Sequence, residues 1–244
     1  AWADSPGSYA ELVRVKADRA LRVPDGVDLD TAAALPLQGL TAHYLVTSTY
    51  PVQQGDTILV HAGAGGVGLL LTQLATARGA RVITTVSSSE KEALSRAAGA
   101  VEVIRYDLLQ DLTAELPGLV KELAGGGVPV VYDGVGRSTF DASLACLRRR
   151  GMMVLFGASS GPVPPFDIQR LNSGGSLFLT RPTLGHYIAT TEELRGRADE
   201  LLAGVLDGSL DVRIGARFAL ADAADAHRAL EGRATTGKVI LEIR

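Results

Sequence analysis

The fold is decided by residues 58–68, which read Ile-Leu-Val-His-Ala-Gly-Ala-Gly-Gly-Val-Gly. The apolar start of this stretch predicts a short buried strand. After it, Gly63, Gly65 and Gly68 fit the pattern G-x-G-x-x-G, and apolar residues then recur at the spacing of a helix. Such a turn lets the diphosphate of a dinucleotide approach the backbone at the amino end of the helix. The pattern is weak by itself, but its place between a strand and a helix favours a dinucleotide-binding turn over a merely tight turn.

Short apolar runs alternate with helical stretches through the middle of the chain. We expect six strands, at residues 58–60, 81–86, 101–104, 128–132, 152–156 and 176–180. This alternation predicts an α/β fold, a doubly wound parallel Rossmann sheet of about six strands with helices on both faces. The helix expected over residues 108–124 contains Pro117, and we expect the proline to interrupt it.

The two ends of the chain follow a different pattern. Residues 8–15 and 238–243 have the character of strands, and residues 190–231 look mostly helical. We expect the ends to pair as a second, mostly antiparallel unit. Because residues 1–35 are short for half of a domain, we also expect further chain in front of Ala1.

The composition excludes several classes of protein. The chain has 244 residues, of which 46% are apolar and 21% charged, so it is too apolar to be disordered. The net charge of −3 does not indicate a nucleic-acid partner, and no apolar stretch reaches the roughly 20 residues that a membrane span needs. Cys146 is the only cysteine and the four histidines lack metal-ligand spacing, so we expect no disulfide, no metal and a reducing, cytoplasmic compartment.

The end of the second expected strand distinguishes between the two nicotinamide dinucleotides. A site for NAD normally carries Asp or Glu roughly 20 residues after the glycine turn, where it holds the ribose hydroxyls. Here residues 86–89 read Val-Ser-Ser-Ser, and Lys91 follows after Glu90. Hydroxyls at Ser87 and a lysine suit a 2′-phosphate, since one charge-assisted hydrogen bond is worth about 1.5–3 kcal/mol. The pattern favours NADPH, although the serines could also cap the next helix and Glu90 weakens the charge argument.

Six stretches of the chain carry a resemblance to a known family. They are residues 40–45 (Leu-Thr-Ala-His-Tyr-Leu), 55–68, 131–136 (Val-Tyr-Asp-Gly-Val-Gly), 156–161 (Phe-Gly-Ala-Ser-Ser-Gly), 179–182 (Leu-Thr-Arg-Pro) and 233–237 (Arg-Ala-Thr-Thr-Gly). Together they resemble the medium-chain dehydrogenase/reductase superfamily, and most closely its zinc-independent NADPH:quinone oxidoreductase branch, which includes zeta-crystallin. The resemblance runs from about Gly7 to Arg244.

The resemblance implies a domain plan and a set of cofactor contacts. Residues 36–182 would form the NADP-binding Rossmann domain, residues 1–35 the C-terminal remnant of an incomplete, β-rich GroES-like catalytic domain, and residues 183–244 would return to that domain. Its cofactor contacts would be Thr41 beside the nicotinamide, Gly63, Gly65, Gly66, Val67 and Gly68 at the diphosphate, Ser87 and Lys91 at the 2′-phosphate, Tyr106 beside the adenosine, Phe156 and Ser159 along the groove, and Arg181 and Arg233 over it.

The chain departs from the family pattern at two places. Gln38 stands where the family commonly has a lysine. Members of the family also begin with most of the GroES-like domain, including the polar residues that line the substrate pocket. The resemblance therefore assigns no catalytic residue within this chain.

The resemblance implies a reaction and an assembly. The reaction is the NADPH-dependent reduction of quinones or other electron-poor enones, by hydride transfer from C4 of the nicotinamide. Two alternatives stay open, an enoyl or acrylyl thioester reductase and a non-catalytic, crystallin-like protein that binds NADPH. A homodimer is also implied, and we expect no membrane or nucleic-acid partner.

Overall fold

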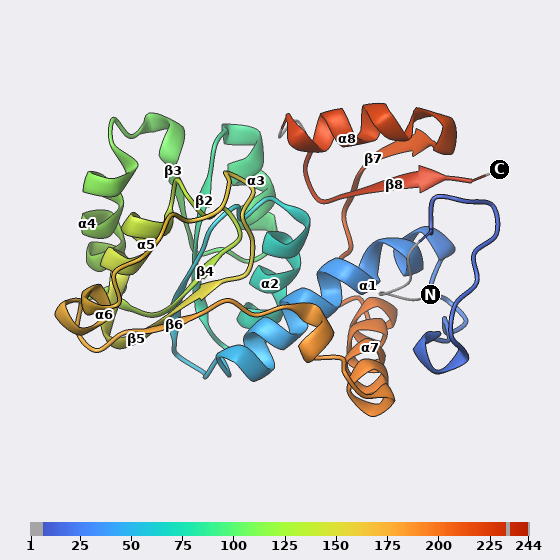
Figure 1. Cartoon of the computed structure of the whole chain (residues 1–244), viewed down its shortest axis with the longest axis horizontal. Coiled ribbons are helices and arrows are strands. Elements are labelled where there is room, and N and C mark those ends of the chain that lie inside the picture. Colours follow the sequence, from blue (N-terminus) through green and yellow to red (C-terminus); the bar gives the residue numbers. More distant parts are fainter. Residues whose placement is uncertain (1–6, 233–234, 244) are drawn as a thin grey trace. The chain divides into compact units, whose positions relative to one another are not determined.

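The computed structural model describes residues 7–232 and 235–243 (Figure 1). The chain divides into two compact units. The first, here called the flanking unit, consists of Ala1–Tyr44, Gly65–Leu70 and Leu184–Arg244. The second, the sheet unit, consists of Leu45–Ala64 and Leu71–Thr183.

The sheet unit is built on six parallel strands in the order β3-β2-β1-β4-β5-β6. Their bounds are β1 Thr57–Val60, β2 Arg81–Val86, β3 Glu102–Arg105, β4 Val128–Asp133, β5 Leu147–Leu155 and β6 Phe178–Thr180. The predicted Rossmann sheet is therefore confirmed, with strand ends that differ by a few residues. The order reverses between β1 and β4, and in such sheets the ligand crevice opens at the carboxyl ends of the two strands on either side of the reversal.

Helices cover both faces of the sheet, which explains why the strands are continuously apolar. Leu59, Ile83 and Met153 on one face form a buried core with residues of α4 (Leu112–Ala124) and α5 (Phe140–Cys146). Figure 1 shows α3 (Ser89–Ala97) on the opposite side of the sheet from α4 and α5. Two further helices follow strands of the sheet: α2 (Gly66–Ala77) follows β1, and the short α6 (Gln169–Ser173) follows β5.

Cys146, the last residue of α5, is fully buried in this core. Burial raises the pKa of its thiol to about 12, against a smaller opposing effect of Lys121. The side chain therefore behaves as a small apolar group.

Helix α4 runs without a break through Pro117, so the expected interruption is wrong. Asp111 caps the helix by accepting hydrogen bonds from the backbone N–H groups of Thr113 and Ala114 at 2.8 and 3.2 Å. Leu116 and the rest of the inner face are buried in the core. The cap and this burial outweigh the single backbone hydrogen bond that a proline removes from a helix.

The expected pairing of the chain ends is also wrong. Residues 8–15 form no strand, and β8 (Lys238–Glu242) pairs instead with β7 (Ile214–Ala219), which lies inside the stretch expected to be mostly helical. The pairing is parallel, with Ile214 opposite Lys238. Parallel neighbours need a crossover connection, and α8 (Ala223–Glu231) provides part of it.

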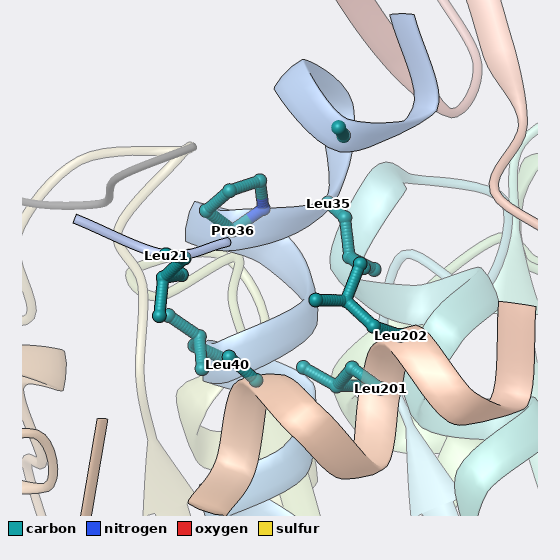
Figure 2. Close-up of a pocket in the computed structure, with 8 residues that line it drawn as sticks. Leu21, Leu35, Pro36, Leu40, Leu201 and Leu202 are labelled. Carbon is teal, nitrogen blue, oxygen red and sulfur yellow. The ribbon is translucent and has the colours of Figure 1, made fainter. Parts of the chain in front are cut away.

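The flanking unit has its own core between α1 (Leu29–Tyr44) and α7 (Thr191–Leu206). Gly39 permits the close approach, because a Cβ there would lie 2.7 Å from Cδ1 of Leu35 and 3.2 Å from Cδ1 of Leu201. A small, wholly apolar pocket remains beside this contact (Figure 2). Its lining consists of Leu21, Ala32, Leu35, Pro36, Leu40, Ala198, Leu201 and Leu202.

Among the described residues, no helix is long and apolar enough to cross a bilayer.

We predict that Leu201→Ala lowers the free energy of unfolding by about 2–5 kcal/mol, because it removes buried methyl groups and enlarges the pocket. Leu201 is 1% exposed, whereas Leu206 on the same helix is 49% exposed. Leu206→Ala is therefore the control and should change stability by less than about 1 kcal/mol. Urea denaturation followed by circular dichroism measures both, and equal losses in the two variants would contradict the packing described here.

Candidate cofactor site

The glycine turn leaves the end of β1 and is fastened to both neighbouring strands. The backbone N–H of His61 donates to the carbonyl of Tyr132 on β4 at 3.0 Å. The N–H of Gly63 donates to the carbonyl of Thr85 on β2, also at 3.0 Å. Ala62 between them takes a φ of 55°, in the left-handed region. The turn therefore stands at the reversal point of the sheet, where a doubly wound fold binds its ligand.

Gly63 is required by a close approach. A Cβ at this position would lie 2.5 Å from Cβ of Thr84 and 2.8 Å from Oγ of Ser95. The hydroxyls of Thr84 and Ser95 lie 2.7 Å apart and join β2 to α3 directly beneath the turn. Any side chain at residue 63 would thus push the turn away from the sheet.

Gly65 makes a second contact, within the flanking unit. It forms an isolated parallel bridge with Gly237, which has a φ of 63°. The residue before β8 is thereby held against the start of α2.

A buried carboxylate supports the loop that follows β4. Asp133 is fully buried and accepts four hydrogen bonds. Its Oδ1 accepts from the backbone N–H groups of Val135 and Gly136 at 2.7 and 3.0 Å. Its Oδ2 accepts from the hydroxyls of Thr139 and Ser143 at 2.7 and 2.8 Å. These four donors compensate for the hydrogen bonds to water that a carboxylate loses on burial.

The network continues from Asp133 to the end of β1. Because the Ser143 hydroxyl donates its proton to Asp133, it must accept from Nε2 of His61, 2.9 Å away. The neutral His61 then accepts at Nδ1 from the Thr85 hydroxyl, at 2.8 Å. Burial lowers the pKa of His61, while the charge of Asp133 acts in the opposite direction. His61 is thus a neutral link in the core rather than a general base.

The end of β2 brings Ser87 and Lys91 together. Nζ of Lys91 donates to Oγ of Ser87 at 3.2 Å. Ser88, and not Ser87, is the cap of α3, because its hydroxyl accepts from the backbone N–H of Lys91 at 3.3 Å. Ser88 therefore caps the helix, while the contact of Ser87 and Lys91 with a 2′-phosphate stays a prediction.

Arg105 is a charged residue at this edge that the sequence reasoning missed. It pairs with Val86 in the register of β2 and β3, so Ser87 and Tyr106 each come directly after one of two neighbouring strand ends. Arg105 forms a bidentate ion pair with Asp107, at 2.6 and 2.7 Å, and this hydrogen bonding raises the pKa of the arginine and lowers that of the aspartate. If β2 and β3 had been assumed to be neighbours, the sequence would have predicted that Arg105 lies at this edge of the sheet.

Phe156 and Ser159 lie beside the loop after β4. The backbone N–H of Phe156 donates to the carbonyl of Asp133 at 2.9 Å, and that of Ser159 to the carbonyl of Gly134 at 3.2 Å. The aromatic ring of Phe156 lies against Gly134, where a Cβ would approach the ring to 2.9 Å. Both residues therefore stand at the same edge of the sheet as the glycine turn.

The other predicted cofactor-binding residues come from several different elements. Arg181 follows β6, and its guanidinium donates to the carbonyl of Pro182 at 3.3 Å. Thr41 belongs to α1 of the flanking unit, where its hydroxyl donates to the carbonyl of Leu37 at 2.7 Å. Val67 and Gly68 lie in the first turn of α2. Arg233 lies outside the described residues.

The chain is similar to known proteins in sequence and in fold. The family model that matches is described as zinc-binding dehydrogenase and covers residues 66–203. A quinone oxidoreductase of Pseudomonas aeruginosa is 46% identical over 243 residues, which are 99% of this chain and 73% of the relative. The chain belongs to the zinc-independent quinone oxidoreductase branch of the medium-chain dehydrogenase/reductase superfamily. This branch is a family of oxidoreductases, and the resemblance stated from the sequence is confirmed.

Two further known proteins are similar to this chain. A solved mycobacterial protein complexed with NADPH has a TM-score of 0.93 and 55% identity, over 96% of this chain and 71% of that one. A 2-haloacrylate reductase of a Burkholderia species is 39% identical over 239 residues, 96% of this chain and 69% of the relative. In the described part of this quinone oxidoreductase-like chain, no three His, Cys, Asp or Glu side chains form a group that could hold a metal ion.

We predict that His61→Gln flattens the dependence of stability on pH between 7 and 5. In the wild-type chain, unfolding frees His61 to bind a proton below its ordinary pKa of 6.5, whereas the folded chain keeps it neutral. Stability is therefore lost as the pH falls below about 6.5, by up to about 1.4 kcal/mol per pH unit. Glutamine can still donate to Ser143 but does not titrate.

Denaturant titrations of both proteins at several pH values measure this effect, because the difference between them isolates His61 from the other titrating groups. Parallel curves would contradict a neutral, buried His61.

Proposed function

We propose that the chain is an NADPH-dependent oxidoreductase that reduces quinones or other electron-poor enones. The observation that carries the proposal is the glycine turn at the sheet reversal, together with the Lys91–Ser87 pair at the end of β2. The mycobacterial structure with NADPH, at 55% identity, supports the choice of cofactor. The Pseudomonas aeruginosa quinone oxidoreductase supports the choice of substrate class.

The residues of the site have distinct roles in this proposal. Unpaired N–H groups and the positive end of α2 hold the diphosphate, as the glycine turn permits. Lys91 and Ser87 hold the 2′-phosphate, and Tyr106 lies beside the adenosine. Phe156 and Ser159 line the groove, Thr41 faces the nicotinamide end, and Arg181 and Arg233 close over the groove. Bound NADPH supplies a hydride from C4 of its nicotinamide, and the protein supplies orientation and exclusion of water.

The organisation of the whole protein is part of the proposal. Residues 36–182 serve as the cofactor domain, while residues 1–35 and 183–244 contribute to a GroES-like catalytic domain. Assembly as a homodimer follows from the family pattern. The single cysteine, a thiol at Cys146, supports a reducing, cytoplasmic location.

A second substrate class has a specific observation in its favour. The 2-haloacrylate reductase that matches 96% of this chain is named for an activated carbon–carbon double bond rather than a quinone. Such an acrylate is electron-poor at its β-carbon and accepts a hydride there, so the same cofactor site can serve it.

We expect Lys91→Ala to weaken NADPH binding by about 10- to 150-fold, because one charge-assisted hydrogen bond to the 2′-phosphate is lost. The dissociation constant for NADH should stay unchanged, since NADH lacks that phosphate. Lys121→Ala, on the exposed face of α4, is the matched control and should leave both cofactors unaffected. Fluorescence titrations measure the constants, and an equal loss of both cofactors in Lys91→Ala would contradict the assignment.

Turnover is measured as the loss of NADPH absorbance at 340 nm, with 1,4-benzoquinone and, separately, with 2-chloroacrylate as the substrate. We expect faster oxidation with the quinone. Faster oxidation with the acrylate would favour the second substrate class, and tight NADPH binding without turnover of either would favour the non-catalytic alternative.

A further inference from the structure

Gly66 is a glycine that the dinucleotide pattern does not demand. The pattern needs glycine at residues 63, 65 and 68, and residue 66 is one of its free positions. Its backbone does not need glycine either, since φ of Gly66 lies outside the left-handed region. Some other contact must account for the missing side chain.

The contact is with Gln38 on α1, in the same flanking unit. A Cβ on residue 66 would lie 2.1 Å from Oε1, 2.3 Å from Cδ and 2.3 Å from Nε2 of Gln38. Because all three carboxamide atoms are almost equally near to that point, the carboxamide occupies the space that a Cβ of residue 66 would need. The absence of a side chain at Gly66 therefore leaves room for the Gln38 carboxamide at the start of α2.

The Gln38 carboxamide lies beside Gly66, which is the first residue of α2. The first N–H groups of a helix have no partner within the helix, and they attract anions. Within residues 7–232 and 235–243, the Gln38 carboxamide has no hydrogen-bond partner. A donor amide thus sits beside the anion-attracting end of α2, with its hydrogen-bonding capacity unused by these residues.

We propose that Gln38 is a binding residue for the diphosphate of the cofactor. Nε2 donates a hydrogen bond to a phosphate oxygen at the start of α2, next to the N–H groups of the glycine turn. The proposal rests on the proposed NADPH function and adds a residue that contacts the part shared by NADPH, NADH and ADP-ribose. Gln38 therefore sets the affinity for any of these dinucleotides and plays no part in choosing between NADPH and NADH.

The test is Gln38→Glu, which keeps the shape of the side chain and replaces the donor by a negative charge. We expect the dissociation constants of NADPH, NADH and ADP-ribose each to rise about 10-fold or more, by the same factor. The ratio of the NADPH and NADH constants should remain that of the wild-type chain. The added charge is compatible with a helix amino end, so the variant should fold.

Gln54→Glu is the matched control. Gln54 also lies against a glycine, Gly79, but just beyond the opposite end of α2, where a Cβ would approach Cγ of Gln54 to 2.9 Å. The same chemical change there should leave all three constants unaltered. Gln38→Met removes the donor without adding charge, and it should give a smaller loss that is again equal for the three ligands.

Three results would overturn the proposal. They are unchanged binding in Gln38→Glu, a loss confined to NADPH, and a loss for NADPH and NADH that spares ADP-ribose, which would place the contact at the nicotinamide end. Failure of the unaltered chain to bind any of the three would instead refute the proposed cofactor function itself. Lys91→Ala distinguishes the two sites, because its loss should appear with NADPH alone.

Discussion

The carboxylate of Asp133 is the group on which the carboxyl edge of the sheet depends. A charge in a dry interior is stable only if donors surround it, and here the donors come from the loop after β4 and from α5. Through Ser143 the requirement extends to His61, and through His61 to Thr85. Three neighbouring strand ends are thereby held in one arrangement, and the glycine turn rises from the middle one.

Much of the fold could be predicted from the sequence, because buried parallel strands and amphipathic helices leave a local pattern. The glycine turn was found in this way, as was the six-strand sheet. The unbroken helix through Pro117 could not be predicted, since the burial that compensates for the proline comes from residues distant in sequence. The parallel pairing of β7 with β8 was missed for a related reason, because strand direction depends on where the connecting chain passes.

The site was predictable to the extent that its residues are adjacent in sequence. Ser87 and Lys91 stand one helical turn apart, so their meeting could be expected from the sequence. Arg105 comes from another strand, and only the register of β2 with β3 places it nearby. The Asp133 network joins residues that are farther apart in the sequence, by up to 82 positions. None of its members has a motif of its own that would have indicated a role in a network.

The burial of Cys146 has a consequence for chemical self-damage. Quinones and activated alkenes are electrophiles, and the thiolate is the form of cysteine that they alkylate. Because burial raises the pKa of the Cys146 thiol to about 12, this thiol stays protonated at neutral pH. It is also shielded by the core. Such electrophiles therefore leave Cys146 unmodified as long as the core around α5 stays folded.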